Sequence, residues 1–166
     1  ALTAGDILVH MTGALIPGAD AWSFSPPAPS AAGVLVIHGF TGNPGSMRGL
    51  AEACAAAGFH VEMPRLPGHG TTIEEMLTTS WADWSGAAAA ALARLAARAE
   101  RIVIAGLSMG GSLTLRLGAD HPDVRGLVCI NPATRPLASA LVEMVEGMLA
   151  AGDEMMPGIG SDIADP

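Results

Sequence analysis

Short apolar runs alternate with amphipathic stretches along most of the chain. Four mainly aliphatic runs predict strands, because strands buried on both faces of a parallel sheet are apolar throughout rather than alternating. Between the runs, apolar residues recur every three to four positions, which predicts helices. The predicted strands are 33–38, 59–66, 101–106 and 124–132, and the predicted helices are 45–58, 80–99 and 110–121.

Signals at the ends of these segments support the assignment. Ser80 is a good N-cap, and Asp83 three residues later suits the first turn of a helix. Gly58 is a plausible C-cap, and Pro122 ends the third helix. The resulting order, β-α-β-α-β-α-β, predicts an α/β fold with a mainly parallel sheet, right-handed crossovers and helices on both faces.

The two ends of the chain follow other patterns. Residues 1–32 are rich in Pro, Gly and Ala, and their short apolar pieces "DILVH" and "AWSFS" predict one or two short edge strands and a loop. After Pro136, residues 137–152 have helical periodicity, no strand follows, and the last residues are loop-like. We therefore divide the chain into a core at 1–136 and a separate segment at 137–166.

Composition narrows the class of protein. The chain has 166 residues, of which 50% are hydrophobic and 14% charged, as expected for one globular domain. Its net charge of −8 disfavours nucleic acid as a partner. No apolar run is long enough to span a membrane, and no signal peptide is visible, so we expect a cytoplasmic location. Cys54 and Cys129 lie in apolar segments without metal-ligand spacing, and we expect buried, reduced thiols and no metal site.

The pattern G-x-S-x-G, formed by Gly106, Ser108 and Gly110, lies between a predicted strand and a predicted helix. The spacing alone is a weak signal in a chain with 21 glycines. Its setting is specific, however, because a nucleophilic serine on a sharp strand–helix turn needs glycine neighbours that allow close backbone approach. The helix N-terminus also favours developing negative charge. Ser108 is therefore the candidate nucleophile, and the alternative is a glycine-rich turn of a nucleotide-binding fold with an incidental serine.

A second motif, "HGFTG" at 38–42, follows the first predicted strand of the core. Acyl transfer requires two backbone N–H donors that bind the oxyanion. One comes from the residue after the nucleophile, here Met109, and the other from a loop after an earlier strand, here at Phe40. His38 and Gly39 support this loop, and the alternative is a plain loop of small residues.

Taken together, the motifs resemble the serine α/β hydrolases, and most closely the carboxylesterase and monoacylglycerol lipase group. The resemblance implies the α/β-hydrolase fold, a Ser–His–Asp triad, ester hydrolysis without a cofactor, and an inserted lid that begins near residue 137. In that family, the histidine at position 38 is structural, and His69 lies in a loop that shapes the rim of the site. The resemblance covers about residues 33–136 and rests on "VLVIHGFTGNPGSMRGLAE", "LPGHGTT", "DW" at 83–84, "GLSMGG" and "VRGLVCINP".

The base that should activate Ser108 is missing from the expected place. In this fold the acid and then the histidine follow the serine along the chain. No histidine follows His121, which lies at a helix end. At the end of the strand after the serine, where an early acid could stand, the residue is Asn131, which is not acidic. His10 and His60 have no motif around them. We therefore expect that the C-terminal remainder of the same polypeptide supplies the acid and the base.

The sequence thus favours a serine ester hydrolase that forms an acyl-enzyme on Ser108. The resemblance implies a small ester or lipid as its substrate, with medium to long acyl chains, monoacylglycerols among them. One alternative is an acyltransferase or cofactor-free perhydrolase on the same fold. Another is a non-catalytic binding module or an inactive fragment.

Overall fold

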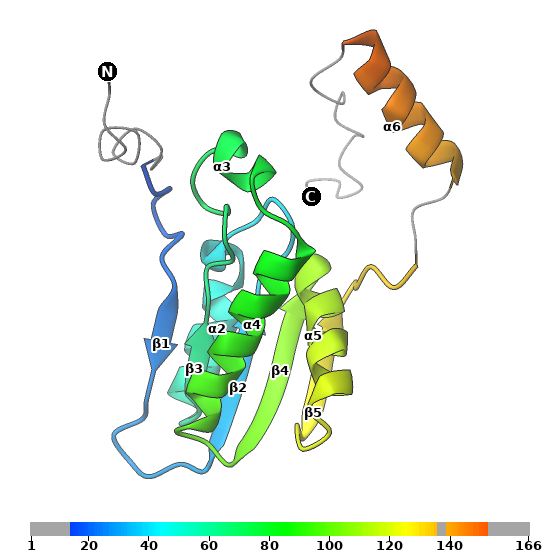
Figure 1. Ribbon diagram of the computed structural model, residues 1–166. Coiled ribbons are helices and arrows are strands. Elements are labelled where there is room, and N and C mark those ends of the chain that lie inside the picture. The colour runs from blue at the N-terminus through cyan, green and yellow to red at the C-terminus, as the bar shows by residue number, and fades with distance from the viewer. Residues whose placement is uncertain (1–13, 136–138, 153–166) are drawn as a thin grey trace, which may run out of the picture. The chain divides into compact units, whose positions relative to one another are not determined.

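The computed structural model describes residues 14–135 and 139–152, which form a twisted sheet, the helices that pack on it, and a further helix (Figure 1). The sheet has five strands in the order β1-β3-β2-β4-β5. Its strands are β1 (Trp22–Phe24), β2 (Ala32–Ile37), β3 (His60–Met63), β4 (Arg101–Leu107) and β5 (Gly126–Ile130). The helices are η1 (Pro44–Met47, a 3-10 turn), α2 (Arg48–Ala56), α3 (Ile73–Leu77), α4 (Trp81–Ala96), α5 (Met109–Asp120) and α6 (Ser139–Ala151).

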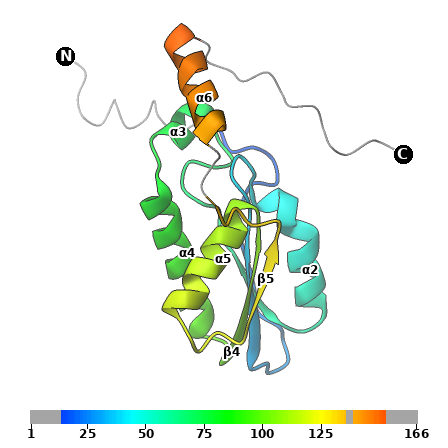
Figure 2. The same ribbon diagram turned by 90° about the vertical axis from the view of Figure 1, so that its right-hand side faces the viewer.

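Strands β2 to β5 are parallel, and β1 is an antiparallel edge strand that pairs with β3. Figure 2 shows α2 on one face of the sheet and α4 and α5 on the other. The chain therefore has the predicted α/β architecture, with crossover helices on both faces. The carboxyl ends of β2 and β4, which are hydrogen-bonded neighbours, lie at the same edge of the sheet.

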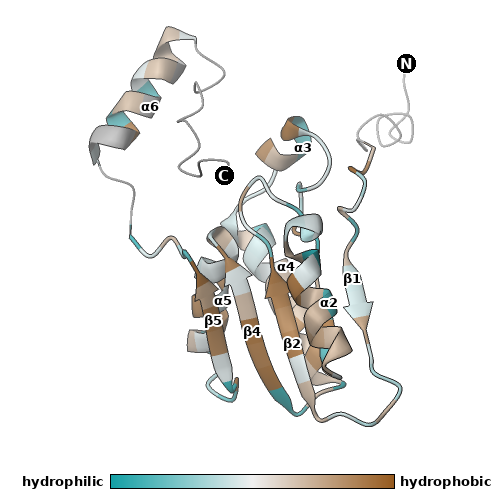
Figure 3. Ribbon diagram, turned by 180° about the vertical axis from the view of Figure 1, so that it is seen from behind, coloured by the Kyte–Doolittle hydropathy of each residue, from teal (hydrophilic) through white to brown (hydrophobic). Residues whose placement is uncertain are grey.

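The core consists of two apolar layers separated by the sheet. Alternate residues of β2 supply both layers, since successive side chains of a strand point to opposite faces. Leu35 and Ile37 pack with α4 and α5, whereas Val34 and Val36 pack with Met47 and its neighbours on the α2 side. Figure 3 shows the matching hydropathy, with β2 and β5 mainly brown and β4 brown along part of its length.

Most predicted elements are present, with small shifts at their ends. The predicted helix 45–58 starts as η1, capped by the Asn43 side chain, continues as α2 and ends before Gly58, whose φ is +84°. Ser80 and Asp83 form a capping box at the start of α4. Helix α3 was not predicted. "AWSFS" contains β1, and "DILVH" lies outside the described residues.

The two cysteines match one expectation and depart from another. Cys54 and Cys129 are both free thiols, as expected, but each is only half-buried, so the expected full burial was wrong. Cys54 is on α2, where it packs at the margin of the apolar layer, and Cys129 is on the outer strand β5. Among the described residues, no helix is long and apolar enough to cross a membrane.

The chain divides into two compact units between Ala133 and Thr134. The first contains the sheet and its helices. The second contains α6, a helix of 13 residues. The assignment of residues 137–166 to a lid stays a prediction.

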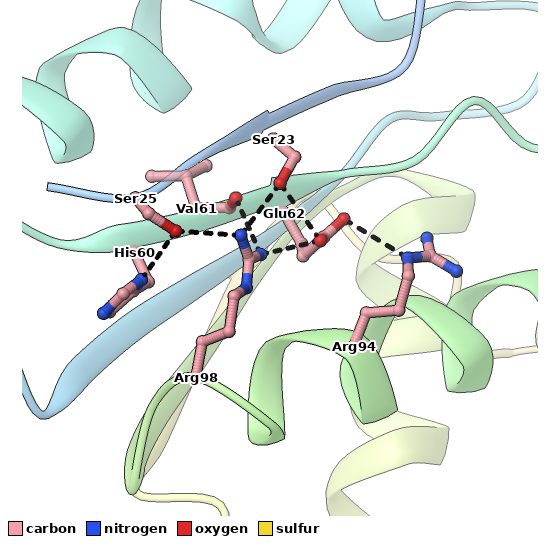
Figure 4. A network of polar contacts seen from close by, with 7 residues as sticks. All are labelled: Ser23, Ser25, His60, Val61, Glu62, Arg94 and Arg98. Carbon is pink, nitrogen blue, oxygen red and sulfur yellow. Dashed lines mark hydrogen bonds and ion pairs between the residues drawn. The ribbon is translucent and has the colours of Figure 1, made fainter.

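A charged network ties β1, β3 and α4 together around Glu62, as Figure 4 shows. The Glu62 side chain is 8% exposed and forms ion pairs with Arg98 at 2.7 Å and Arg94 at 3.6 Å. Ser23 donates a hydrogen bond to the same carboxylate at 3.2 Å. Arg98 also donates to the hydroxyls of Ser23 and Ser25. The buried carboxylate is therefore fully partnered, and it links the edge strand to a helix on one face of the sheet.

Replacing Glu62 with alanine is expected to lower the free energy of unfolding by about 2 kcal/mol, because Arg98 loses the partner of a largely buried charge. The ion pair with Arg94 adds little to this value, because the Arg94 side chain is largely exposed to solvent. Chemical denaturation of the protein measures the effect. Glu52→Ala is the matched control, since Glu52 is exposed on α2, and a change there should stay within about 0.5 kcal/mol. Equal losses in the two variants would contradict a role for the network.

Candidate active site

A sharp turn between β4 and α5 carries Ser108. The strand ends at Leu107 and the helix begins at Met109, so one residue makes the whole reversal. Ser108 has φ 53° and ψ −117°, a backbone conformation that is strained for any residue other than glycine. Its N–H donates to the carbonyl oxygen of Ile130 on β5 at 2.8 Å, which anchors the turn to the neighbouring strand.

The glycines on either side of the serine are required by close backbone contacts. A Cβ on Gly106 would overlap the carbonyl group of Gly110 and lie 2.5 Å from the Thr114 hydroxyl oxygen. A Cβ on Gly110 would overlap the backbone carbonyls of Ile37 and His38. The first turn of α5 thus lies directly against the ends of β4 and β2, which is possible only without side chains at both positions.

The loop of residues 38–42 lies against this turn. A Cβ on Gly39 would come within 3.2 Å of the Ser108 Cβ, so the loop and the serine are in direct contact. The loop closes in a tight turn, in which Gly42 N–H donates to the Gly39 carbonyl oxygen at 3.2 Å. Thr41, within this loop, is another non-glycine residue with a positive φ, of 60°. Met109 is the first residue of α5, so its N–H has no acceptor in a preceding helical turn.

Two buried histidines lie close together here: His38, the first residue of the 38–42 loop, and His69, with ring centroids 5.1 Å apart. Leu66 N–H donates to Nε2 of His38 at 3.1 Å, so Nε2 carries a lone pair and the proton is on Nδ1. The Nδ1–H donates to the Gly39 carbonyl oxygen at 2.9 Å. Nδ1 of His69 donates to the Pro67 carbonyl oxygen at 2.9 Å. The supporting role of His38 stays a prediction, and His69 is buried in its loop.

An aromatic cluster next to the loop was not predicted as a unit. Phe40, which is 52% exposed, contacts both His69 and Trp84 edge-on. The indole N–H of Trp84 donates to Pro67 O and to the Thr79 hydroxyl, each at 3.1 Å. The quoted motifs contain all three rings, but only the packing of α4 on the sheet brings them together. A pocket of about 310 Å³ opens beside the loop and His69, lined on one side by Ile73 and Met76 around α3.

Burial makes the stability of the protein depend on pH through His38. Mainly because burial disfavours the charged imidazolium, the pKa of His38 falls from 6.5 to about 4. Between these values, the unfolded chain binds a proton that the folded protein does not. The free energy of unfolding is therefore unaffected by the titration of His38 above pH 6.5. It falls by up to about 3 kcal/mol as the pH falls from 6.5 toward 4.

Denaturation curves at several pH values measure this loss. The slope of stability against pH between 4 and 6.5 should be smaller in His38→Asn than in the unchanged protein. An identical slope in both proteins would contradict the assignment of the loss to His38.

The other described histidines lie away from Ser108. His60 bonds the Ser25 hydroxyl and the Ser30 carbonyl at the far end of the sheet, and His121 caps the C-terminus of α5. His10 lies outside the described residues. In the part of the chain that the structure describes, the Ser108 hydroxyl makes no hydrogen bond to a histidine or a carboxylate. Within residues 14–135 and 139–152, the serine, the loop and the glycines are thus assembled without a base bonded to the Ser108 hydroxyl.

Comparison with known proteins assigns the chain to a family. The family model described as the alpha/beta hydrolase fold matches residues 34–158, and the chain therefore belongs to the α/β hydrolase fold family. The chain is 46% identical over 136 residues to a thermostable monoacylglycerol lipase from Bacillus sp. (strain H-257), covering 81% of this chain and 52% of that protein. It is 34% identical over 119 residues to a carboxylesterase from Bacillus subtilis (strain 168), covering 70% of this chain and 47% of that protein.

A solved structure agrees with these relatives. It comes from work on LipS and LipT, two metagenome-derived lipolytic enzymes, and matches with a TM-score of 0.75 and 41% sequence identity. The match covers 90% of this chain and 59% of that one. The chain spans about half the length of the curated relatives it matches.

Proposed function

We propose that the protein is a serine ester hydrolase in which Ser108 is the nucleophile. The observation that carries the proposal is the strained turn at Ser108 with the 38–42 loop in contact with it. A serine in this conformation projects from a strand–helix turn, and the cost of the strain is expected at functional sites. The relatives named as lipase and carboxylesterase support the same chemistry.

In the proposed reaction, the Ser108 oxygen attacks the ester carbonyl carbon while a histidine takes the hydroxyl proton. The N–H groups of Phe40 and Met109 bind the oxyanion of the tetrahedral intermediate. Collapse of the intermediate breaks the bond to the alcohol, which leaves with the proton from the histidine. Water then repeats the sequence on the acyl-enzyme and releases the carboxylic acid.

The base and the acid that orients it are proposed to belong to the C-terminal remainder of the polypeptide. Two observations support this assignment. Among the described residues, neither His38 nor His69 bonds the Ser108 hydroxyl: both ring nitrogens of His38 are hydrogen-bonded, to Gly39 and Leu66, and His69 donates from Nδ1 to Pro67. In addition, the stretch that this chain shares with the two relatives makes up only about half of each relative's length. No metal or organic cofactor takes part in the proposed chemistry.

The proposed substrates are carboxylic esters of medium to long acyl chains, with monoacylglycerols among them. The half-exposed Phe40, which contacts Trp84, offers apolar surface on the loop whose Gly39 lies against the serine. A pocket of about 310 Å³ opens beside Thr41 of the same loop. The relative named as a monoacylglycerol lipase supports the same class. Residues 137–166 are proposed as the start of a lid.

Labelling with a fluorophosphonate probe tests the nucleophile in the full-length protein. The probe should attach to a single serine, and peptide mapping should place it on Ser108.

Hydrolysis of p-nitrophenyl esters of increasing acyl length, followed by monoacylglycerols, tests the substrate class. Absence of both labelling and hydrolysis would overturn the proposal, whereas hydrolysis of short esters alone would overturn only the acyl-length part.

A further inference from the structure

We propose that His38 is a positioning residue that sets the direction of the Phe40 N–H. This inference rests on the proposed function, in which that N–H binds the oxyanion. It concerns one peptide group, the bond between Gly39 and Phe40, which contains the Gly39 carbonyl and the Phe40 amide. His38 does not contact the reacting atoms in this proposal, and it acts only through that peptide.

The geometry of a trans peptide connects the two groups. The C=O and N–H of one planar peptide point in opposite directions, and the described residues contain no cis peptide. The Gly39 carbonyl oxygen is held by two donors, Nδ1–H of His38 at 2.9 Å and Gly42 N–H at 3.2 Å. Holding the oxygen toward the imidazole therefore turns the Phe40 N–H to the opposite side.

The hydrogen bond from Leu66 N–H to Nε2 of His38 determines which way the hydrogen bond between Nδ1 and the Gly39 carbonyl runs. Because the Leu66 N–H can only donate, Nε2 of His38 must accept, and the single proton of the neutral ring must be on Nδ1. Without the Leu66 contact, either tautomer could form, and a proton on Nε2 would leave two lone pairs facing each other at Gly39. Leu66 thus selects the tautomer that holds the peptide.

The surroundings keep the ring in place. The His38 side chain is completely buried, and its neighbours with ionisable groups are His69, whose ring centroid lies 5.1 Å away, and Arg65. Arg65 donates to the His69 carbonyl oxygen at 3.0 Å, which fixes the segment that follows Leu66. One imidazole therefore joins the 38–42 loop to the segment 65–69.

A purely structural role and a positioning role predict different behaviour for two variants. In His38→Asn, the amide nitrogen occupies the place of Nδ1 and can still donate to the Gly39 carbonyl, but the acceptor for Leu66 is lost. In His38→Gln, the amide oxygen occupies the place of Nε2 and can still accept from Leu66, but the donor to Gly39 is lost. Both variants lose the ring, so packing changes alike.

Steady-state kinetics and thermal denaturation of the full-length variants test the inference. We expect similar falls in melting temperature, with kcat for ester hydrolysis at least 10-fold lower in His38→Gln than in His38→Asn. The reference is that removal of a whole oxyanion donor costs about 100- to 1,000-fold in kcat. Equal kcat in the two variants, or a lower kcat in His38→Asn, would overturn the proposal.

Nitrogen NMR of the histidine side chains gives a readout that does not depend on activity. We expect a protonated Nδ1 and an unprotonated Nε2 in His38 at neutral pH. We also expect the Phe40 amide resonance to move more in His38→Gln than in His38→Asn. If the protein neither hydrolyses esters nor reacts with the probe, the proposed function fails. The NMR result then still decides whether His38 holds the peptide, and a proton on Nε2 refutes it.

Discussion

Replacing Ser108 with alanine in the full-length protein is expected to lower kcat for ester hydrolysis by about 10⁴-fold or more. The reason is that the acyl-enzyme can no longer form, and only binding and the two N–H donors remain to assist water. Initial rates with a p-nitrophenyl ester measure the loss, and the fluorophosphonate label should disappear with it. Ser85→Ala, a change on the surface of α4, is the control and should leave both unchanged.

Substitutions of Ser108 are expected to affect stability differently from activity. An alanine at position 108 has the same positive φ as the serine and should change the free energy of unfolding little. Glycine adopts that region freely, so Ser108→Gly should raise it by about 1 kcal/mol while remaining inactive. A rate in either variant close to that of the unchanged protein would show that another group is the nucleophile.

Local features of the site could be predicted from the sequence. The turn at Ser108 follows from a short apolar strand, two glycines and an amphipathic helix, all within 20 residues. The 38–42 loop follows in the same way from the strand before it. Both the turn and the loop depend on close contact between backbone segments. Glycines at a fixed spacing indicate such contacts, because only glycine lacks the Cβ that would clash. The α/β architecture could be predicted because β2 and β4 are apolar on both faces.

Long-range contacts could not be predicted in this way. The ion pairs of Glu62 join residues that lie more than 30 positions apart, and nothing in "FHVEMPRL" marks its glutamate as buried. The cluster of Phe40, His69 and Trp84 also depends on how α4 packs beside the loop. Helix α3 has only five residues, too few for a periodic signal.

Replacing Gly110 with alanine is expected to destabilise the protein by about 3 kcal/mol or more, the largest effect on stability among these variants. The new methyl group would overlap the carbonyls of Ile37 and His38, which are backbone groups and cannot rotate away. Relief would require α5 to move off β2. Such a movement would carry the Met109 N–H and the Ser108 turn away from the 38–42 loop, so activity should fall with stability.

Gly86→Ala provides the matched control, because it makes the same chemical change inside a helix. A Cβ at Gly86 would meet nothing within 4 Å, and alanine is the better helix former. That variant should therefore be more stable than the unchanged protein by about 0.5 to 1 kcal/mol. Denaturant unfolding of both variants should give shifts of opposite sign. Two shifts of the same sign would mean that helix propensity, and not contact between α5 and β2, decides the outcome at Gly110.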